Sequence, residues 1–378
     1  MVKSKKNSRL STVIKIRLVF ICVLNLIVVL TIGKTQTHLS SNYEESLKSA
    51  YGGEPNTRSG NIAEPDVPLQ HLSVPASEPC ALLFFGRVIH FKSTILPSIQ
   101  KNIIQPNKHC DIFLHTYNIT VVPKNPRSSE TGLSTTNITE AYLLVANNNN
   151  DVDDHIVFES MESFYSKRAQ DVNRTRQNFH EGYGECCISH DHMMKQWNSI
   201  EGAWDLMRSH EKKILSGLSS DVTNSKDDEN DRYYKYVGLF RTDVFYLTPI
   251  EVSGAVAVVP KFTSAFGFND RMFYGKYEWA KVWATKRFGF IPEFEKRYMI
   301  HPEQVRVPPV AGFHSEFFLK NLMNHYKVPV MKSTRECFLR VRSGPKILKS
   351  DCKEYSEYNS IDKVNIYLSK NVTLVTKG

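Results

Sequence analysis

The stretch KYVGLFRTDVFYLTPI, residues 235–250, places two ionisable side chains at the end of an apolar run. Residues 236–240 have the composition of a buried strand, and Arg241 and Asp243 follow it directly. Charged groups at such a position are costly unless something pairs with them. A carboxylate is a hard ligand for Mn²⁺ or Mg²⁺, and a guanidinium matches phosphate oxygens. Arg241 and Asp243 therefore bind a phosphate-bearing ligand, with Asp243 as a metal ligand, or form an ion pair that ties the strand end to a loop.

Four other residues, later in the chain, are candidates for acid–base chemistry or phosphate contact. Asp270 lies in a glycine-flanked loop, where it is a general base or an ordinary turn aspartate. Its neighbour Arg271 contacts phosphate or pairs locally. Glu316 begins a predicted helix, where it is a general base or simply stabilises the helix N-terminus. His314 is a metal ligand, an acceptor contact or a neighbour of the helix cap.

The first strand of the chain ends in a second candidate site. Residues 81–85 form a short apolar run that Gly86 and Arg87 close, where backbone either approaches a nucleotide or makes a plain turn. Residues 93–104 have helical spacing with Ser93 as a candidate N-cap, and residues 110–117 read as another strand. This βαβ unit predicts a parallel sheet covered by helices. In such sheets ligands bind beyond the carboxyl ends of the strands, where Arg241 and Asp243 would lie.

The remaining elements complete one predicted α/β domain of about 300 residues. The sequence predicts a less ordered region after the second strand and, later, a Gly-rich aromatic loop over residues 262–275. The acidic runs 151–153 and 227–231 are expected to be solvated loops, although the first spells D-x-D. The other predicted elements are helices at 191–213, 277–288 and from 314, and strands at 244–247 and 255–259.

The N-terminus predicts a membrane anchor. Six of the nine excess positive charges precede residue 18, so the rest of the chain carries only +3 and nucleic-acid binding is not expected. Residues 18–33 lack any charge and, with flanking residues that snorkel, are long enough to span a bilayer. The positive-inside rule places residues 1–17 in the cytosol and the rest in the lumen. A cleaved signal peptide is the alternative. Residues 34–78 read as a stem, and residues 79–378 as the luminal domain.

Sequons and cysteines agree with a secretory compartment. Four glycosylation sequons follow the anchor, at Asn118, Asn137, Asn173 and Asn371. Six cysteines also follow it, an even number that favours disulfides in an oxidising lumen, with the pairing left open. They are Cys80, Cys110, Cys186, Cys187, Cys337 and Cys352. No Cys/His spacing indicates a structural zinc site.

The order of several segments resembles GT-A-type glycosyltransferases, especially poorly characterised families with a strand-end R-x-D motif. These segments are ALLFFGR, CDIFLHTY, QWNSIEGAWDLM, FRTDVFYLTPI, AVAVVPKF, GFNDRMFYGKYEWAKVWATKRF and FHSEFFLKNLM. The resemblance covers residues 80 to about 330. It implies a GT-A-like, Rossmann-type, mostly parallel sheet with flanking helices. It also implies that the strand-end motif does the work of D-x-D, and QWNSIEGAWDLM is similar to the helix with a Gln and a Ser that these families carry before the acidic motif.

The resemblance assigns roles to the candidate residues. A nucleotide sugar would be bound by Gly86, Arg87, Arg241, Asp243 and Arg271. Asp243 would hold a divalent metal, Mn²⁺ or Mg²⁺. Asp270 or Glu316 would be the catalytic base, and Asp270 could instead hydrogen-bond hydroxyls of the donor sugar. Because Arg241 stands where many members have Asp, it could take over part of the metal's charge-neutralising role.

The expected protein is a single-pass type II enzyme of the Golgi or endoplasmic reticulum membrane. It would transfer a sugar from a nucleotide-sugar donor to a hydroxyl of a glycan or glycoprotein acceptor. One alternative is a lectin-like or receptor ectodomain on the same fold. A second alternative is a sulfotransferase that uses Arg87 and Lys92. The sequence does not predict the donor sugar, the acceptor, the stereochemical outcome or the oligomeric state.

Overall fold

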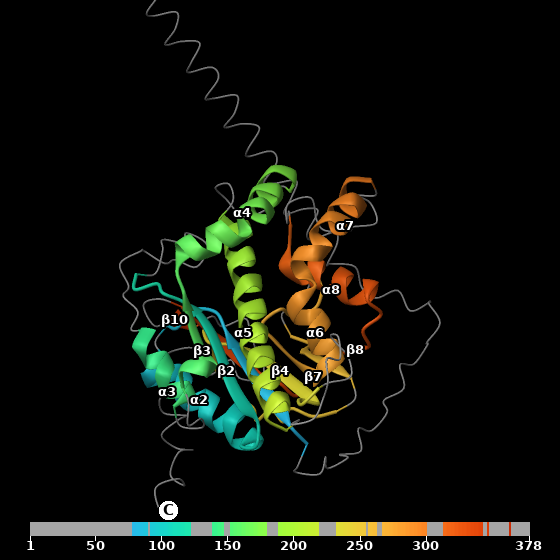
Figure 1. Ribbon diagram of the computed structural model, residues 1–378. Helices are drawn as coiled ribbons and strands as arrows, with labels where there is room; N and C mark the ends of the chain where they lie inside the picture. The colour runs from blue at the N-terminus through green and yellow to red at the C-terminus, as the bar shows by residue number, and fades with distance from the viewer. Residues whose placement is uncertain are drawn as a thin grey trace, which may run out of the picture. The chain divides into compact units, whose positions relative to one another are not determined.

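The protein is described by a computed structural model for residues 78–89, 91–121, 138–146, 152–179, 188–218, 232–254, 256–262, 267–300, 313–342, 346–347 and 363 (Figure 1). These residues belong to one compact unit, His71–Gly378. The predicted anchor, 18–33, lies outside the described residues. Within them, no helix combines the length and the apolar character that a membrane crossing needs.

A central sheet of seven strands, in the order β3-β2-β1-β4-β7-β6-β8, organises the described part of the chain. The strands β1 to β4 pair in parallel, β7 is antiparallel to both β4 and β6, and β8 is parallel to β6. This arrangement confirms the predicted α/β fold with a mostly parallel sheet. The bounds are β1 Cys80–Phe85, β2 Asp111–Tyr117, β3 Ile156–Glu159, β4 Tyr236–Arg241, β6 Ala257–Pro260, β7 Met272–Lys276 and β8 Val330–Ser333.

The register aligns three carboxyl strand ends. Phe85 of β1 pairs with His115 of β2 on one side and with Arg241 of β4 on the other. Because β1 has β2 on one side and β4 on the other, its carboxyl end lies where an open α/β sheet forms a ligand crevice. Antiparallel β7 begins at this edge, since Met272 pairs with Phe240. The sheet therefore delivers side chains from both β4 and the segment before β7 to one place.

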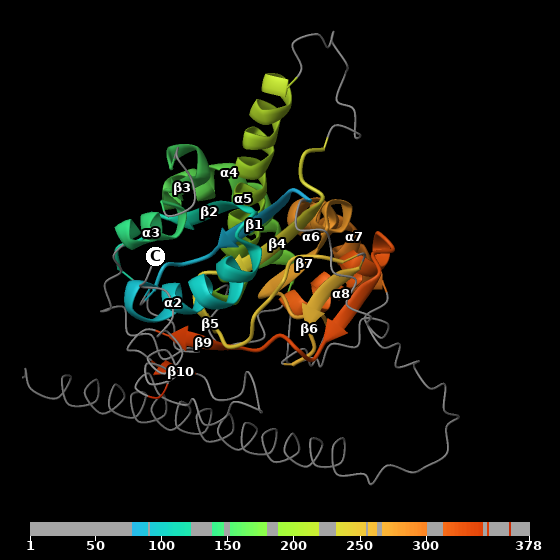
Figure 2. The ribbon, with the colours of Figure 1, turned by 90° about the horizontal axis from the view of Figure 1, so that it is seen from below.

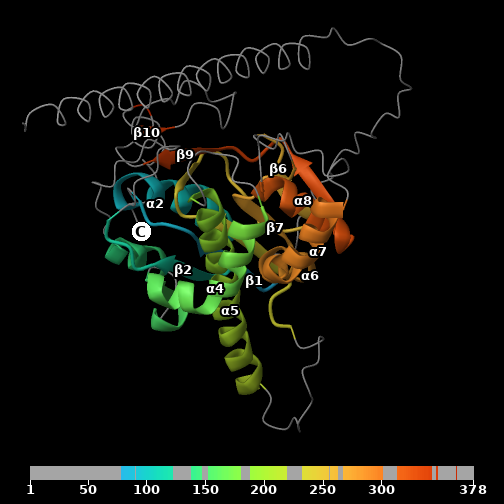
Figure 3. The same ribbon diagram turned by 90° about the horizontal axis from the view of Figure 1, so that it is seen from above.

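The sheet separates two hydrophobic cores, and β1 contributes to both because its side chains alternate. Ala81, Leu83 and Phe85 join the core on the face covered by α5 (Ile188–Leu218) and α6 (Tyr277–Thr285). The intervening side chains pack on the opposite face with α2 (Leu96–Ile99) and α3 (Tyr142–Val145). Figures 2 and 3 show α5 and α2 on opposite sides of β1 and β2.

A second sheet of three strands packs with the α2 core. Its order is β10-β9-β5, with antiparallel pairing throughout, and Figure 2 shows β5 and β9 on the α2 side. The bounds are β5 Val244–Tyr246, β9 Phe338–Arg342 and β10 Lys346–Ile347. Since only two residues separate the end of β4 from the start of β5, this sheet directly abuts the strand-end motif.

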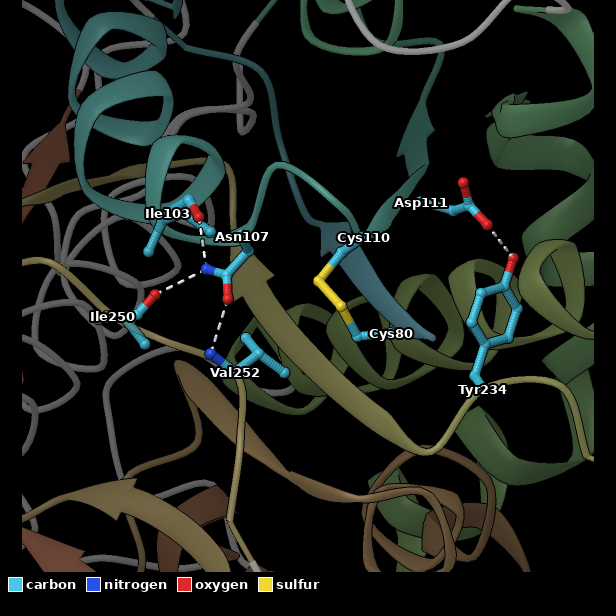
Figure 4. The surroundings of a disulfide bond; sticks show 8 residues. All are labelled: Cys80, Ile103, Asn107, Cys110, Asp111, Tyr234, Ile250 and Val252. Carbon is cyan, nitrogen blue, oxygen red and sulfur yellow. Dashed lines mark hydrogen bonds between the residues drawn. A yellow bond between two sulfur atoms is a disulfide. The ribbon is translucent and has the colours of Figure 1, made fainter. Parts of the chain in front are cut away.

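The crossover from β1 to β2 is a helical run over residues 91–107, closed by a disulfide between Cys80 and Cys110. Figure 4 shows Asn107 beside this bond, with its amide nitrogen donating to the carbonyls of Ile103 and Ile250. The run begins at Phe91, so Ser93 is not its N-cap. The βαβ unit is as predicted, and its helical part starts two residues earlier.

Several elements differ from the sequence-based expectations. The region after β2 holds β3 and α4 (Met161–Asn178), where the sequence predicted little order. The predicted loop 262–275 ends in β7, and the predicted helix 277–288 is two helices, α6 and α7 (Arg287–Ile300). Helix α8 (Ser315–His325) begins as predicted, directly after His314.

Candidate active site at the carboxyl ends of β1 and β4

Asp243 lies between two arginines at the turn from β4 to β5. Arg241 donates to its two carboxylate oxygens from Nε and Nη2, at 2.7 and 2.6 Å. Arg342 of β9 donates to Oδ2 at 3.2 Å from Nη1. Burial opposes ionisation of this carboxyl group, but the two guanidinium charges outweigh it and hold the pKa of Asp243 well below its ordinary value. Asp243 is thus a buried carboxylate with a cation on each side.

The pairing of β9 with β5 positions Arg342. The strands are antiparallel, with Val244 opposite Arg340, and the Val341 N–H donates to the Asp243 carbonyl at 3.1 Å. These backbone bonds fix the end of β9 against the strand-end turn. Arg342, about one hundred positions after Asp243 in the sequence, thereby becomes the second guanidinium partner of this carboxylate.

The two arginine side chains are largely buried but retain more exposure than the carboxylate between them. The side chains of Arg241 and Arg342 are 18% and 11% exposed, whereas that of Asp243 is 1% exposed. Solvent thus reaches part of each arginine side chain and almost none of Asp243.

Gln196 of α5 links this motif to Asp270. Its Oε1 accepts from Arg241 Nη1 at 3.1 Å, and its Nε2 donates to the carbonyl and Oδ2 of Asp270 at 3.0 and 3.2 Å. Ser315, at the start of α8, donates to the same Oδ2 at 2.7 Å. Burial disfavours the Asp270 anion, but Arg271 and Arg241 outweigh it and lower its pKa to about 2. Asp270 is therefore a fixed anion near neutral pH.

Glu316 is the carboxyl group with the opposite electrostatics. It is 4% exposed, and burial, with the nearby Asp270 anion, raises its pKa to about 7 although Arg271 donates to Oε1 at 3.0 Å. Arg271 also lies 3.9 Å from Asp270 Oδ1, so it contacts both acids. The backbone is close here too, because a Cβ on Gly267 would lie 2.0 Å from the Glu316 carbonyl oxygen. The site therefore combines a fixed anion with a group able to exchange a proton near pH 7.

The end of β1 is tied to the same helix and turn. Gly86 has a φ of 107°, and its N–H donates to Ser199 Oγ of α5 at 3.0 Å. Thr242 Oγ1 donates to the Arg87 carbonyl at 2.9 Å, which joins the ends of β1 and β4. Arg87 is half-buried, and its charge contributes to the low pKa of Asp243. Gly86 and Arg87 thus lie at the strand-end site, as expected, in a turn that needs glycine.

A Ser–His–Glu arrangement beside this turn is structural. His115 Nδ1 lies 3.1 Å from Ser199 Oγ, and its Nε2 lies 3.3 Å from Glu159 Oε2. However, Ser199 is fully buried, and its hydroxyl donates to the His115 carbonyl while accepting from Gly86 N–H. This hydroxyl is committed to the fold and is not a nucleophile.

A buried arginine lies on the core side of the acids. Arg287 is fully buried at the start of α7, 4.1 Å from the ring centroid of Trp283, and its Nε donates to the Trp283 carbonyl. Its Nη1 and Nη2 have no hydrogen-bond partner within the described part of the chain. Burial lowers the pKa of Arg287 to about 9, and the charge of Asp270 opposes that shift. The charge of Arg287 therefore contributes to the low pKa of Asp270.

The described residues do not form a metal-binding cluster at this site. Both oxygens of Asp243 accept from guanidinium groups, and Asp270 and Glu316 have their own donors. Within the described ranges, the side chains close enough to share an ion are Cys80, His109 and Cys110, two of which form the disulfide. The donor set around Asp243 thus fits an anion better than a divalent cation.

The predicted nucleotide-binding and catalytic residues come together at this site. His314 and Lys92 were the other two candidates. His314 is the N-cap residue of α8 but makes no side-chain capping bond, and Lys92 is exposed on the β1–β2 crossover. Sequence reasoning missed Arg342, Arg287 and Ser315. The alternation in FLRVR gave a weak strand signal for Arg342, whereas nothing in the sequence marked Arg287 or Ser315.

The other sequence-based candidates lie apart from the site or beyond the described residues. Asn118 and Asn173 are exposed. In the Asn173 sequon, however, the Thr175 hydroxyl is buried and donates to a carbonyl within α4. Asn137, Asn371 and the acidic run 227–231 lie outside the described residues, and of the run 151–153 only Val152 and Asp153 are described.

Comparisons with known proteins add little to this picture. No family model matches the chain, and a search of curated proteins finds no match. Among solved structures, the chain is similar to mouse xyloside xylosyltransferase 1 in its apo form, with a TM-score of 0.32 and 11% identity over 68% of this chain and 85% of that chain. A TM-score this low does not establish a common fold.

Proposed function

We propose that the chain is a glycosyltransferase that moves a sugar from a nucleotide-sugar donor to an acceptor hydroxyl. The observation that carries this proposal is that Glu316, a carboxyl group with a pKa of about 7, belongs to one contact network with the strand-end guanidinium groups of Arg241 and Arg342. Glycosyl transfer to a hydroxyl needs both a proton acceptor and positive charge for a phosphate leaving group.

The leaving group would be bound at the β4 end of the site. As the bond between the anomeric carbon and the diphosphate oxygen breaks, its electron pair stays on that oxygen. The guanidinium groups of Arg241 and Arg342 compensate the charge that develops there, because their ion pairs with Asp243 already hold them in place.

The acceptor would be activated at the α8 end of the site. The ionised carboxylate of Glu316 takes the hydroxyl proton while the hydroxyl oxygen forms its bond to the anomeric carbon. Asp270 is unsuited to this step because a pKa of about 2 makes it a weak base. As a fixed anion held by Gln196 and Ser315, it would instead accept hydrogen bonds from sugar hydroxyls.

The enzyme is proposed to be a type II membrane protein of the Golgi or endoplasmic reticulum. Residues 1–17 would be cytosolic, 18–33 the anchor, 34–78 the stem and 79–378 the luminal domain. The disulfide between Cys80 and Cys110 supports an oxidising compartment, and Cys337 is also disulfide-bonded. The acceptor would be a glycan or glycoprotein in that lumen.

A nucleotide screen tests this function. The full chain, purified in detergent, would be heated with UDP, GDP or CMP, with and without Mn²⁺, and one nucleotide is expected to raise its unfolding temperature. Sugar release from the corresponding nucleotide sugars would then be measured. Substitution Glu316→Gln is expected to keep nucleotide binding and to lower transfer by about a hundredfold or more.

Other outcomes of the nucleotide screen and of the Glu316→Gln variant would contradict the proposed function or the role of Glu316. A chain that none of the nucleotides stabilises is not a nucleotide-sugar enzyme, which leaves the lectin-like ectodomain and the sulfotransferase. Stabilisation by adenosine 3′,5′-bisphosphate instead would favour a sulfotransferase. Normal transfer by the Glu316→Gln variant would remove Glu316 from the mechanism while leaving the enzyme class intact.

A further inference from the structure

We infer that Arg241 and Arg342 bind the diphosphate of the donor without a divalent metal, and that Asp243 serves as the buried anion that holds them. This inference rests on the proposed function and specifies how its phosphate site works. It replaces the metal-binding role that the sequence predicts for Asp243.

The two guanidinium groups keep donors available after their bonds within the protein are made. Arg241 uses one N–H each from Nε, Nη1 and Nη2, and Arg342 uses its two Nη1 N–H groups for Asp243 and the Val341 carbonyl. A guanidinium has five N–H donors. Two therefore remain on Arg241 and three on Arg342, within the part of the chain that the structure describes. Phosphate oxygens are the acceptors that such a paired fork fits.

Asp243 is poorly placed to bind a cation. Its oxygens accept from guanidinium nitrogens at 2.6–3.2 Å, and its side chain is 1% exposed. A metal ion bound to one of these oxygens would lie close to the guanidinium group that donates to the same oxygen. The two positive charges would repel each other strongly, because the dielectric constant is low in this buried site. Metal binding would require one arginine to leave its buried partner.

The charges also favour an anionic ligand over a metal. Arg241, Arg342 and Arg87 carry three positive charges against the two anions Asp243 and Asp270, which leaves one net positive charge. A nucleoside diphosphate is the anionic ligand class that carries enough negative charge to balance this group. Since the ion pairs are preformed, little reorganisation would accompany binding.

Calorimetry on the wild-type chain tests this inference directly. The full chain in detergent would be titrated with the nucleoside diphosphate found in the screen, once in EDTA and once in MnCl₂. The expected Kd values agree within about threefold, because the cations that bind phosphate belong to the protein. A Kd more than about tenfold weaker in EDTA, restored by Mn²⁺, overturns the inference but leaves the proposed function standing. Absence of binding under both conditions overturns both.

Matched arginine variants identify the residues. Arg342→Gln is expected to weaken nucleotide binding about tenfold to a hundredfold, since each lost contact is a charge-assisted hydrogen bond. Arg297→Gln is the control, because Arg297 lies on α7 in an exposed pair with Glu293. Equal affinities of the Arg342→Gln variant and the wild type would overturn the assignment, provided that both unfold cooperatively.

Asp243→Asn separates the two roles of the aspartate. If Asp243 is the holding anion, the variant loses thermal stability, and whatever affinity it keeps is the same in EDTA and in MnCl₂. If Asp243 is a metal ligand, the variant loses the response to Mn²⁺ that the wild type shows. The wild-type titration decides the question even where this variant fails to fold.

Discussion

At the scale of single residues, Glu316 makes activity depend on pH. Burial and the neighbouring Asp270 anion raise its pKa from 4.5 to about 7. If Glu316 accepts the acceptor proton, kcat/KM should fall about tenfold per pH unit below pH 7 and level off above it. The pH–rate profile of the wild type measures this, with the Glu316→Gln variant as control. A profile that is flat between pH 5 and 8 would contradict the assignment.

The same pKa predicts a stability difference. Between pH 4.5 and about 7, the folded state holds a proton on Glu316 that the unfolded chain has lost, so wild-type stability falls as the pH rises through this window. Relative to Glu316→Gln, the wild type should lose up to about 3 kcal/mol across it and no more above it. Urea unfolding at pH 4.5, 6 and 8 checks the trend. A wild type that gains stability over this range would contradict it.

The sequence predicted part of the site because those residues lie near the ends of apolar strands or helices. Arg241 and Asp243 follow a buried run, and Glu316 opens a helix, so local pattern alone marks them. Arg342 joins them only because β9 pairs with β5, and no local pattern encodes that pairing. The ion pairs of Asp243 with Arg241 and Arg342 also needed the structure, since they depend on how the β4–β5 turn meets β9.

At the scale of elements, the contact of α5 with β2 depends on Gly202. A Cβ there would lie 2.2 Å from His115 Cδ2, so the helix would have to move away from the sheet or the ring would have to turn. Gly202→Ala should therefore destabilise the fold by about 1–3 kcal/mol, as overpacking does. It should also weaken nucleotide binding, because Gln196 and Ser199 are on the same helix.

Gly217 gives a matched control in the same helix. Nothing lies within 4 Å of a Cβ built there, so Gly217→Ala should stabilise by about 0.5–1 kcal/mol through helix propensity alone. Urea unfolding of both variants measures the difference. Equal stabilities would show that the packing of α5 against His115 is not as close as described.

The elements themselves were predictable where one pattern dominates. The apolar runs of β1, β2 and β4 and the long amphipathic α5 stand out in the sequence. Helix α4 was missed because only Phe164, Val172 and Thr175 of it are buried, which leaves little periodicity. Strand β7 was missed because Gly275 and its aromatic neighbours resemble a loop, although the chain there is extended and paired with β4.

At the scale of the whole molecule, the disulfide between Cys80 and Cys110 stabilises the first βαβ unit. It joins the start of β1 to the residue before β2, 30 positions away. Closing a loop of this length is worth about 3–4 kcal/mol in the chain-entropy account. In urea unfolding, the double variant Cys80→Ala, Cys110→Ala should lose about that much free energy of unfolding. Adding reductant to this variant should not destabilise its β1–β2 unit further, because the bond is already absent. A loss under 1 kcal/mol would show that the disulfide contributes little to the stability of the fold.

The proposed membrane topology makes the last prediction. In microsomes, the luminal domain should resist added protease until detergent is present, and Asn118, which is exposed at the end of β2, should carry a glycan. Removing glycans enzymatically should lower the apparent mass, and Asn118→Gln should remove part of that shift. Arginine or lysine substitutions within residues 18–33 should release the chain from the membrane or prevent its insertion, since charges at the bilayer centre are costly. A chain digested by protease in intact microsomes would have the opposite orientation, and its active site would then face the cytosol.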